Sequence, residues 1–138
     1  MDNLHIVHKI PTVEEFIYIR KETGWDTYDF KAAEISLKNS LIGVCANYNE
    51  KLVGFGRIVG DKGMYFYIQN MIVIPEFQGR GIGKLIMIEL MDYIDKNCPK
   101  GSFIGLMASR GKEKFYEKFD FIIRPKGKYG AGMFMVKH

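Results

Sequence analysis

Cysteine, histidine and long apolar runs are all scarce in this chain of 138 residues. Its two cysteines, Cys45 and Cys98, have no CxxC spacing and no histidine cluster nearby, so neither a disulfide framework nor a zinc site is indicated. The longest apolar runs fall far short of the ~18 residues that a membrane span needs. The first residues also lack the basic start and apolar core of a secretory signal. We therefore expect a cytoplasmic protein with reduced thiols, no metal and no membrane partner.

A large excess of one charge is missing as well. The chain carries 20 lysines and arginines against 16 acidic residues, a formal net charge of +4, and its lysines are spread along the sequence. Nucleic-acid-binding surfaces usually cluster their basic residues, so we expect no nucleic-acid partner, whereas the modest positive balance suits an anionic ligand. The length and the apolar share of 47% predict one globular domain, residues 1–138. A homodimer is compatible with these figures.

The apolar periodicity predicts a mixed α/β (α+β) fold. Thr12 and Glu15 have the spacing of a capping box at the start of a helix, and Asn49 with Glu50 suits a tight hairpin between two strands. The expected strands are residues 4–9, 41–48, 51–59, 64–74, 102–108, 121–123 and 133–136, and the expected helices are residues 13–22, 30–39, 82–96 and 112–118.

Strict alternation is expected along the strand at residues 64–74, because successive side chains of a strand point to opposite faces. One face would then carry Phe66, Ile68, Asn70, Ile72 and Ile74, and the other would carry Tyr65, Tyr67, Gln69, Met71 and Val73.

The segment PEFQGRGIGK, residues 75–84, places three glycines between a predicted strand and a predicted helix. A helix start offers unpaired main-chain N–H groups and partial positive charge, and glycines let the backbone approach a phosphate. A plain strand-to-helix connection usually needs fewer glycines. A Walker A loop is excluded because Leu85 follows Lys84 where Ser or Thr is needed, and the GxGxG spacing departs from the dinucleotide fingerprint. The segment therefore predicts an anion site of another kind.

The QxxGxG spacing of Gln78, Gly81 and Gly83 resembles the acyl-CoA signature of the GNAT superfamily of N-acetyltransferases. MIVIPEFQGRGIGKLIM is similar to the strand, loop and helix of that family, and MASRGKEKFYEKFDF resembles a segment in which many relatives carry FYxKxGF. The order of predicted elements also matches, so the resemblance covers nearly the whole chain. It implies a single-domain GNAT-like fold, with a central, mostly antiparallel twisted sheet of roughly six to seven strands, a splayed strand pair, and helices on both faces.

The resemblance further implies acetyl-CoA as the acyl donor. Main-chain N–H groups of the glycine loop would hold its pyrophosphate, and the preceding strand would pair with its pantetheine arm as with an extended peptide. One N–H group of that strand would also stabilise the oxyanion formed on attack. The implied CoA-binding residues are Met71, Ile72, Val73, Gln78, Gly79, Arg80, Gly81, Ile82, Gly83, Lys84, Ser109 and Lys112.

Tyr116 falls on the tyrosine that protonates the departing thiolate in many relatives. A phenol has an ordinary pKa of about 10 and so carries its proton at neutral pH. Packing in an aromatic cluster with neighbouring phenylalanines is the alternative role. The sequence departs from the family pattern at three positions, where Ser109 replaces a common Asn, Lys112 a small residue and Asp120 a glycine.

The acceptor side is less sharply indicated. Trp25, Tyr65 and Tyr67 would line an aromatic pocket for an amine, since a cation over a ring face gains ~0.5–2 kcal/mol, although a packed core or an interface would explain them equally well. Neither cysteine lies near a histidine base, so no covalent intermediate is expected. The candidate general bases, each of which could equally be a surface carboxylate, are Asp26, Asp29, Glu34 and Glu76.

Together these features predict an N-acetyltransferase in which a primary amine of a small molecule attacks acetyl-CoA directly in a ternary complex. Acetylation of a protein N-terminus or lysine stays open as an alternative acceptor chemistry. A non-catalytic acyl-CoA-binding module and a nucleotide-binding regulator are the alternatives from other functional classes.

Overall fold

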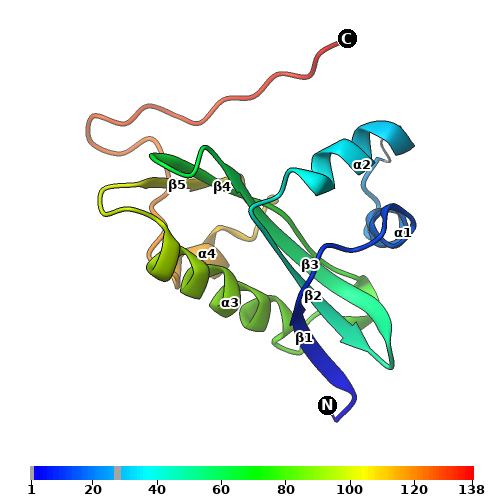
Figure 1. Cartoon of the computed structure of the whole chain (residues 1–138). Coiled ribbons are helices and arrows are strands. Elements are labelled where there is room, and N and C mark those ends of the chain that lie inside the picture. The colour runs from blue at the N-terminus through cyan, green and yellow to red at the C-terminus, as the bar shows by residue number, and fades with distance from the viewer. Residues whose placement is uncertain (1, 27–28) are drawn as a thin grey trace. The chain divides into compact units, whose positions relative to one another are not determined.

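A computed structural model of the chain describes residues 2–26 and 29–138 (Figure 1). The predicted loop between the first two helices includes positions 27 and 28, which lie outside the described residues. The chain divides into two compact units, Met1–Gly105 and Leu106–His138. The expected single domain therefore stays a prediction.

The first unit is built on one open sheet with the strand order β1-β2-β3-β4-β5. Its first four strands pair antiparallel in chain order. Asn49 and Glu50 form the predicted tight turn between β2 and β3. Before β4, the carboxylate of Asp61 accepts the amide of Tyr65 over 3.0 Å and closes the next turn. The strands are β1 (Leu4–His8), β2 (Ile42–Tyr48), β3 (Lys51–Gly60), β4 (Tyr65–Val73) and β5 (Phe103–Leu106).

Helices cover both faces of this sheet, as expected. The helices of the first unit are α1 (Val13–Glu22), α2 (Phe30–Lys38) and α3 (Ile82–Asn97). Gly54 of β3 lies against Ile86 of α3, whereas its neighbour Phe55 packs edge-on against Phe16 of α1 with ring centroids 6.1 Å apart. Because successive strand residues face opposite sides, α3 lies on one face and α1 on the other, with α2 beside α1 (Figure 1).

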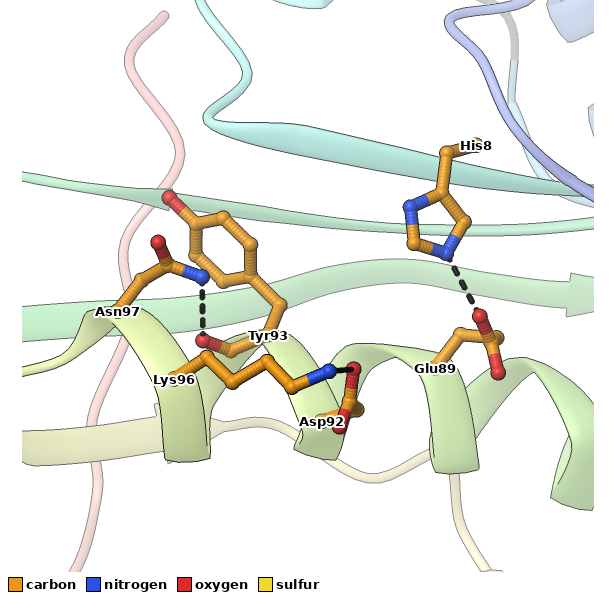
Figure 2. A network of polar contacts seen from close by, with 6 residues as sticks. All are labelled: His8, Glu89, Asp92, Tyr93, Lys96 and Asn97. Atoms are coloured by element: carbon orange, nitrogen blue, oxygen red, sulfur yellow. Dashed lines mark hydrogen bonds and ion pairs between the residues drawn. The ribbon is translucent and has the colours of Figure 1, made fainter.

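The predicted capping box starts α1. The amide of Glu15 donates to the Thr12 hydroxyl oxygen over 3.1 Å, and the Thr12 amide donates to the Glu15 carboxylate over 2.8 Å. On the other face, Figure 2 shows His8 of β1 paired with Glu89 of α3 at 2.7 Å. Exposed pairs of this kind contribute about 0–1 kcal/mol, so the buried apolar side chains between sheet and helices hold the unit together.

The second unit contains α4 (Glu113–Glu117) and an otherwise irregular chain. The strands expected at 121–123 and 133–136 are wrong, because no strand forms there; an isolated bridge joins Lys126 and Tyr129 instead. Ile122 is 67% exposed and Met133 is 86% exposed. High strand propensity does not make a strand unless a neighbour supplies cross-strand contacts. The described residues thus form five strands and four α-helices, not the expected six to seven strands.

The strict alternation expected along β4 is also wrong beyond Gln69. Ile68 pairs with Ile58 on the α3 face, whereas Asn70 bonds to Arg57 on the α2 face. A register shift at this point inserts an extra residue into β4. Such a bulge reverses the alternation of all later residues, so Ile72 lies opposite Phe55 on the α1 face.

Candidate functional site

The glycine-rich segment follows β4 directly and leads into α3 (Figure 1). It begins with a short 3₁₀ turn, Pro75–Phe77, and continues through Gly79 and Gly81, whose φ values are 78° and 81°. A side chain at either glycine would meet open space, so the left-handed backbone and not crowding favours glycine there. The first two glycines therefore shape a turn that an ordinary residue would strain.

The first turn of α3 presents main-chain N–H groups that have no acceptor within the helix. Gly81 is its N-cap, and no side chain caps the helix. The amides of Ile82, Gly83 and Lys84 have no carbonyl a turn earlier within the helix, and the helix dipole adds partial positive charge at this end. Arg80 and Lys84 are exposed beside it. These groups together make a site suited to a phosphate or pyrophosphate.

The loop is fastened to the sheet on both sides of its first turn. Phe77 is buried, and its ring packs against Tyr48 of β2 with centroids 5.1 Å apart, while the Arg80 guanidinium lies over the same ring at 5.1 Å. The Gln78 side-chain amide donates to the carbonyl oxygen of Val73 over 2.8 Å. The loop therefore has a fixed position relative to the end of β4.

Val73 presents its main-chain groups to the outer edge of β4. The amide of Ile74 donates to the Val53 carbonyl over 3.0 Å, and Val73 lies opposite Gly54. Because this bond joins the residues that flank the pair, Val73 and Gly54 are a non-hydrogen-bonded pair of the antiparallel ladder. The N–H and C=O groups of Val73 therefore point away from β3. The neighbouring Ile72 accordingly points its main-chain groups toward β3.

β5 joins the same edge of β4 near the start of that strand. The Phe103 amide donates to the Met64 carbonyl over 2.8 Å, and Gly105 lies beside the Tyr67 ring. Gly105 is the last residue of the first unit. In the described part of that unit, β5 therefore does not reach Val73, and an extended ligand could pair with the edge there.

The predicted CoA-binding residues of the first unit thus form one continuous structure at the end of β4 and the start of α3. Ser109 and Lys112 belong to the second unit, where both are exposed and the Lys112 amide donates to the Ser109 carbonyl over 2.9 Å. Lys112 is the N-cap residue of α4. This turn sets the start of the helix that carries Tyr116.

Tyr116 is buried in the second unit, and burial raises the pKa of its phenol. Its ring makes edge contacts with Phe115 and Phe121 at centroid distances of 5.0 and 6.4 Å. Tyr116 thus packs in an aromatic cluster and still carries a protonated hydroxyl at neutral pH, so the two roles are compatible. One turn earlier, a carboxylate oxygen of Glu113 is buried without a hydrogen-bond partner in the described chain, a feature that the sequence did not indicate.

The acceptor-side aromatics of the first unit differ in exposure. Trp25 is 51% exposed and Tyr65 58% exposed, whereas Tyr67 is half-buried beside β5. Arg20 positions the loop that carries Trp25, because its guanidinium donates twice to the Asp26 carbonyl, at 2.6 and 2.9 Å. Arg20 thus fixes the backbone beside Trp25 at Asp26.

Two of the four candidate bases have structural partners. The Asp29 carboxylate caps α2 by accepting the Ala32 amide over 3.1 Å, and Glu34 pairs with Lys31 at 3.3 Å. Asp26 and Glu76 are exposed. The general base therefore stays unassigned among these carboxylates.

The thiols do not form a nucleophilic site. Cys45 is buried, and burial, reinforced by the nearby Glu15 carboxylate, raises the pKa of its thiol to about 12. Its sulfur lies 3.2 Å from the Lys9 carbonyl. Burial also raises the pKa of Cys98. No cluster of metal-ligating side chains occurs in residues 2–26 and 29–138, and no helix of these ranges could span a bilayer.

Two residues of the site region were missed from the sequence, Arg57 and Asn70. Arg57 is buried in β3 and donates to the Asn70 side chain over 2.8 Å. The available signals were a lone arginine in the apolar run of β3 and a lone asparagine near the apolar end of β4. Neither signal shows by itself that the two side chains meet.

Comparison with known proteins agrees with this geometry. The family model of the acetyltransferase (GNAT) domain matches residues 25–137. The uncharacterized N-acetyltransferase ycf52 of Pyropia yezoensis is 35% identical over 111 residues, which cover 78% of this chain but only 63% of that protein. The chain thus spans less than two thirds of the length of this curated relative.

Solved structures extend the likeness over nearly the whole chain. A Staphylococcus aureus protein of unknown function, a probable acetyltransferase, is 31% identical with a TM-score of 0.88, covering 97% of this chain and 99% of that one. A GNAT family acetyltransferase from Streptococcus pneumoniae shares the fold with a TM-score of 0.76 at 23% identity, covering 97% and 98% of the two chains. With its glycine loop, open strand edge and mixed fold, the chain belongs to the GNAT acetyltransferase family.

Proposed function

We propose that the protein transfers an acetyl group from acetyl-CoA to a primary amine of a small molecule. The observation that carries this proposal is the continuity between the edge of β4 at Val73, the loop fastened by Gln78, and the uncapped start of α3. A CoA ester needs both an anion site for its pyrophosphate and an amide-pairing edge for its pantetheine. Here the two lie side by side in one unit.

The residues divide the proposed chemistry between them. The glycine loop and the first amides of α3 bind the pyrophosphate, and Val73 pairs with the pantetheine amides. Acetyl-CoA supplies an activated carbonyl carbon, which the neutral amine attacks so that a C–N bond forms and the C–S bond breaks. An amide of the β4 edge stabilises the charge on the carbonyl oxygen. Tyr116 gives its proton to the departing thiolate, and the surplus amine proton passes to a carboxylate or to water.

A peptide amine is the second candidate acceptor. The observation that favours it is the exposure of Trp25 and Tyr65, each more than half open to solvent in the first unit. Exposed rings suit an open groove, whereas a small cation gains most from rings that exclude water. The solved plant glucosamine-6-phosphate N-acetyltransferase shares only the fold at 16% identity and so does not decide between the two acceptors.

A screen that follows thiol release from acetyl-CoA tests the proposal. The panel contains small primary amines, amino sugars, and peptides with free N-termini or lysines. Release with small amines alone supports the first acceptor class, and release with peptides alone supports the second. Binding of CoA without thiol release across the panel would replace catalysis by a binding function, and calorimetric binding of ATP or NAD without CoA would contradict both.

A further inference from the structure

The bulge in β4 centres on a residue in an unfavourable backbone conformation. Asn70 has a φ of 58°, and the register between β3 and β4 shifts beside it, between Phe55 and Arg57. A non-glycine residue rarely adopts this left-handed conformation, although asparagine tolerates it better than most. Such a conformation persists only where its surroundings hold it in place.

Arg57 supplies that hold. It is 7% exposed, and its Nε donates to the Asn70 Oδ1 over 2.8 Å. Its two terminal nitrogens reach the other way: Nη1 donates to the Ser36 carbonyl at 2.9 Å and to the Ser40 hydroxyl at 3.1 Å, and Nη2 donates to the Ser36 hydroxyl at 2.9 Å. One planar group therefore ties the end of α2 to the bulge.

The position of the bulge gives this contact a consequence for the open edge. Asn70 immediately precedes Met71, and Val73 follows shortly afterwards with its N–H directed at that edge. A bulge bends its strand and increases the local twist, so its geometry sets the direction of the amides that follow. Loss of the Arg57 contact would let the backbone at Asn70 relax, and the main-chain amides of residues 71–73 would then change direction.

We propose that Arg57 is a positioning residue, which acts through Asn70 to aim the main-chain edge of Met71–Val73 at the acyl-pantetheine arm of the donor. This inference rests on the proposed function, because that function supplies the ligand of the edge. The guanidinium is buried and bonded to Asn70, Ser36 and Ser40, so its proposed action is through the bulge. Its planar fork reaches three partners at fixed angles, which a lysine ammonium cannot reproduce.

Two ligands distinguish the contribution of the β4 edge to binding from that of the glycine loop. Acetyl-CoA uses both parts of the site, whereas 3′-phospho-ADP, the nucleotide half of CoA, uses the loop alone. Asn70→Gly keeps the left-handed conformation without strain but deletes the acceptor of the Arg57 hydrogen bond. We expect its Kd for acetyl-CoA to rise about tenfold, with the Kd for 3′-phospho-ADP within about twofold of wild type.

Matched variants complete the design. Asn70→Asp keeps an oxygen acceptor for Arg57 and should hold the Kd for acetyl-CoA within about threefold. Arg57→Lys should reproduce the selective loss seen for Asn70→Gly. Asn49→Gly makes the same substitution at another positive φ, 50°, in the β2–β3 turn, and should leave both ligands unaffected. Hydrogen exchange of the unliganded protein should be faster at Ile72, whose N–H group faces β3, in Asn70→Gly and Arg57→Lys but not in Asn49→Gly.

The outcomes separate the two proposals. Wild-type protein that binds neither ligand would overturn the proposed function and this inference with it. Wild-type binding combined with an unchanged Kd for acetyl-CoA and unchanged exchange in Asn70→Gly would overturn this inference alone. Equal losses for both ligands would also overturn it, because they would indicate a general change in structure.

Discussion

The side-chain amide of Gln78 donates to the main-chain carbonyl of Val73 over 2.8 Å, joining the first residue of the QxxGxG signature to the last residue of β4. The main-chain N–H of Gln78 donates to the Pro75 carbonyl over 3.2 Å and closes the 3₁₀ turn. The glutamine therefore fixes the loop against the strand, and the later amides are the ones available to a phosphate. Under the proposed function, this contact would keep the pyrophosphate site and the pantetheine edge in a fixed relative position.

Replacing Gln78 tests this role. Gln78→Met removes the donor at similar length, and loss of one hydrogen bond worth about 0.5–1.5 kcal/mol should weaken CoA binding roughly two- to tenfold. Calorimetric titration measures the Kd. Asn97→Leu is the control, because the Asn97 side chain also donates to a main-chain carbonyl, that of Tyr93 over 2.9 Å, but at the far end of α3. A larger effect at Asn97 than at Gln78 would contradict the anchoring role.

The left-handed turn at Gly81 should matter for both folding and binding. Gly81→Ala forces an L residue to a φ of 81° and should cost about 1–2 kcal/mol in the free energy of unfolding. The relaxed turn would also displace the first amides of α3 and weaken CoA binding. Gly101→Ala, at a φ of 90° and also in open space, should cost similar stability with unchanged Kd. Denaturant unfolding and calorimetry together check this, and an equal Kd for both variants would speak against the anion site.

Removing the hydroxyl of Tyr116 tests the acid role. In Tyr116→Phe we expect kcat to fall about 10²–10⁴-fold, the usual contribution of a general acid, with the Kd for acetyl-CoA nearly unchanged. The aromatic packing around the ring survives this change, so thermal unfolding should move little. Steady-state kinetics and calorimetry give the two values. An unchanged kcat would leave Tyr116 as a packing residue.

Cys45 should make the protein less stable in alkali. Because burial raises the folded pKa of its thiol from 9.0 to about 12, the unfolded chain releases this proton first as the pH rises. The contribution of the protonated Cys45 thiol to the free energy of unfolding is therefore complete below pH 9.0 and is lost progressively toward pH 12. Burial raises the pKa of Tyr116 and adds the same trend.

Cys45→Ala isolates the contribution of this thiol. The variant should show a flatter decline of the free energy of unfolding above pH 9.0, while Cys98→Ala should change the slope less. Turnover should persist in both variants, because the proposed reaction has no acyl-cysteine intermediate. Loss of turnover in Cys45→Ala, together with acetylation of Cys45 in the wild-type protein detected by mass spectrometry, would contradict direct attack.

Asp120 occupies a position where glycine should be better. Its φ is 69°, in the left-handed region that favours glycine. Asp120→Gly should raise the free energy of unfolding by about 1 kcal/mol. Glu117→Gly removes the same charge from the last residue of α4, where φ is negative, and should lower the free energy of unfolding by up to about 1 kcal/mol. Opposite signs in chemical unfolding would confirm the backbone argument, and equal signs would reject it.

The sequence predicted most of the first unit well, because its signals there are local. The capping box of Thr12 and Glu15, the turn at Asn49, and the glycine loop each depend on residues close in the chain. The apolar stripe of α3 needed only helical periodicity. These elements were expected within a residue or two of their observed bounds.

Non-local features could not be predicted in this way. Asn70 at the bulge bonds to Arg57 of another strand, which also bonds to Ser36 of a helix, and alternation alone gives no sign of the bulge or of these contacts. The two final strands failed for a related reason, since a strand requires a partner that propensity does not supply. The open edge at Val73 likewise follows from ladder register and not from residue type.

The proposed activity of this chain is transfer of an acetyl group from acetyl-CoA to an amine. The most direct measurement mixes the wild-type protein with acetyl-CoA labelled with ¹³C in the acetyl group and an amine panel, and follows the label by mass spectrometry. We predict labelled amide and free CoA in equal amounts, with no label on the protein. Tight CoA binding without any labelled amide would contradict the account.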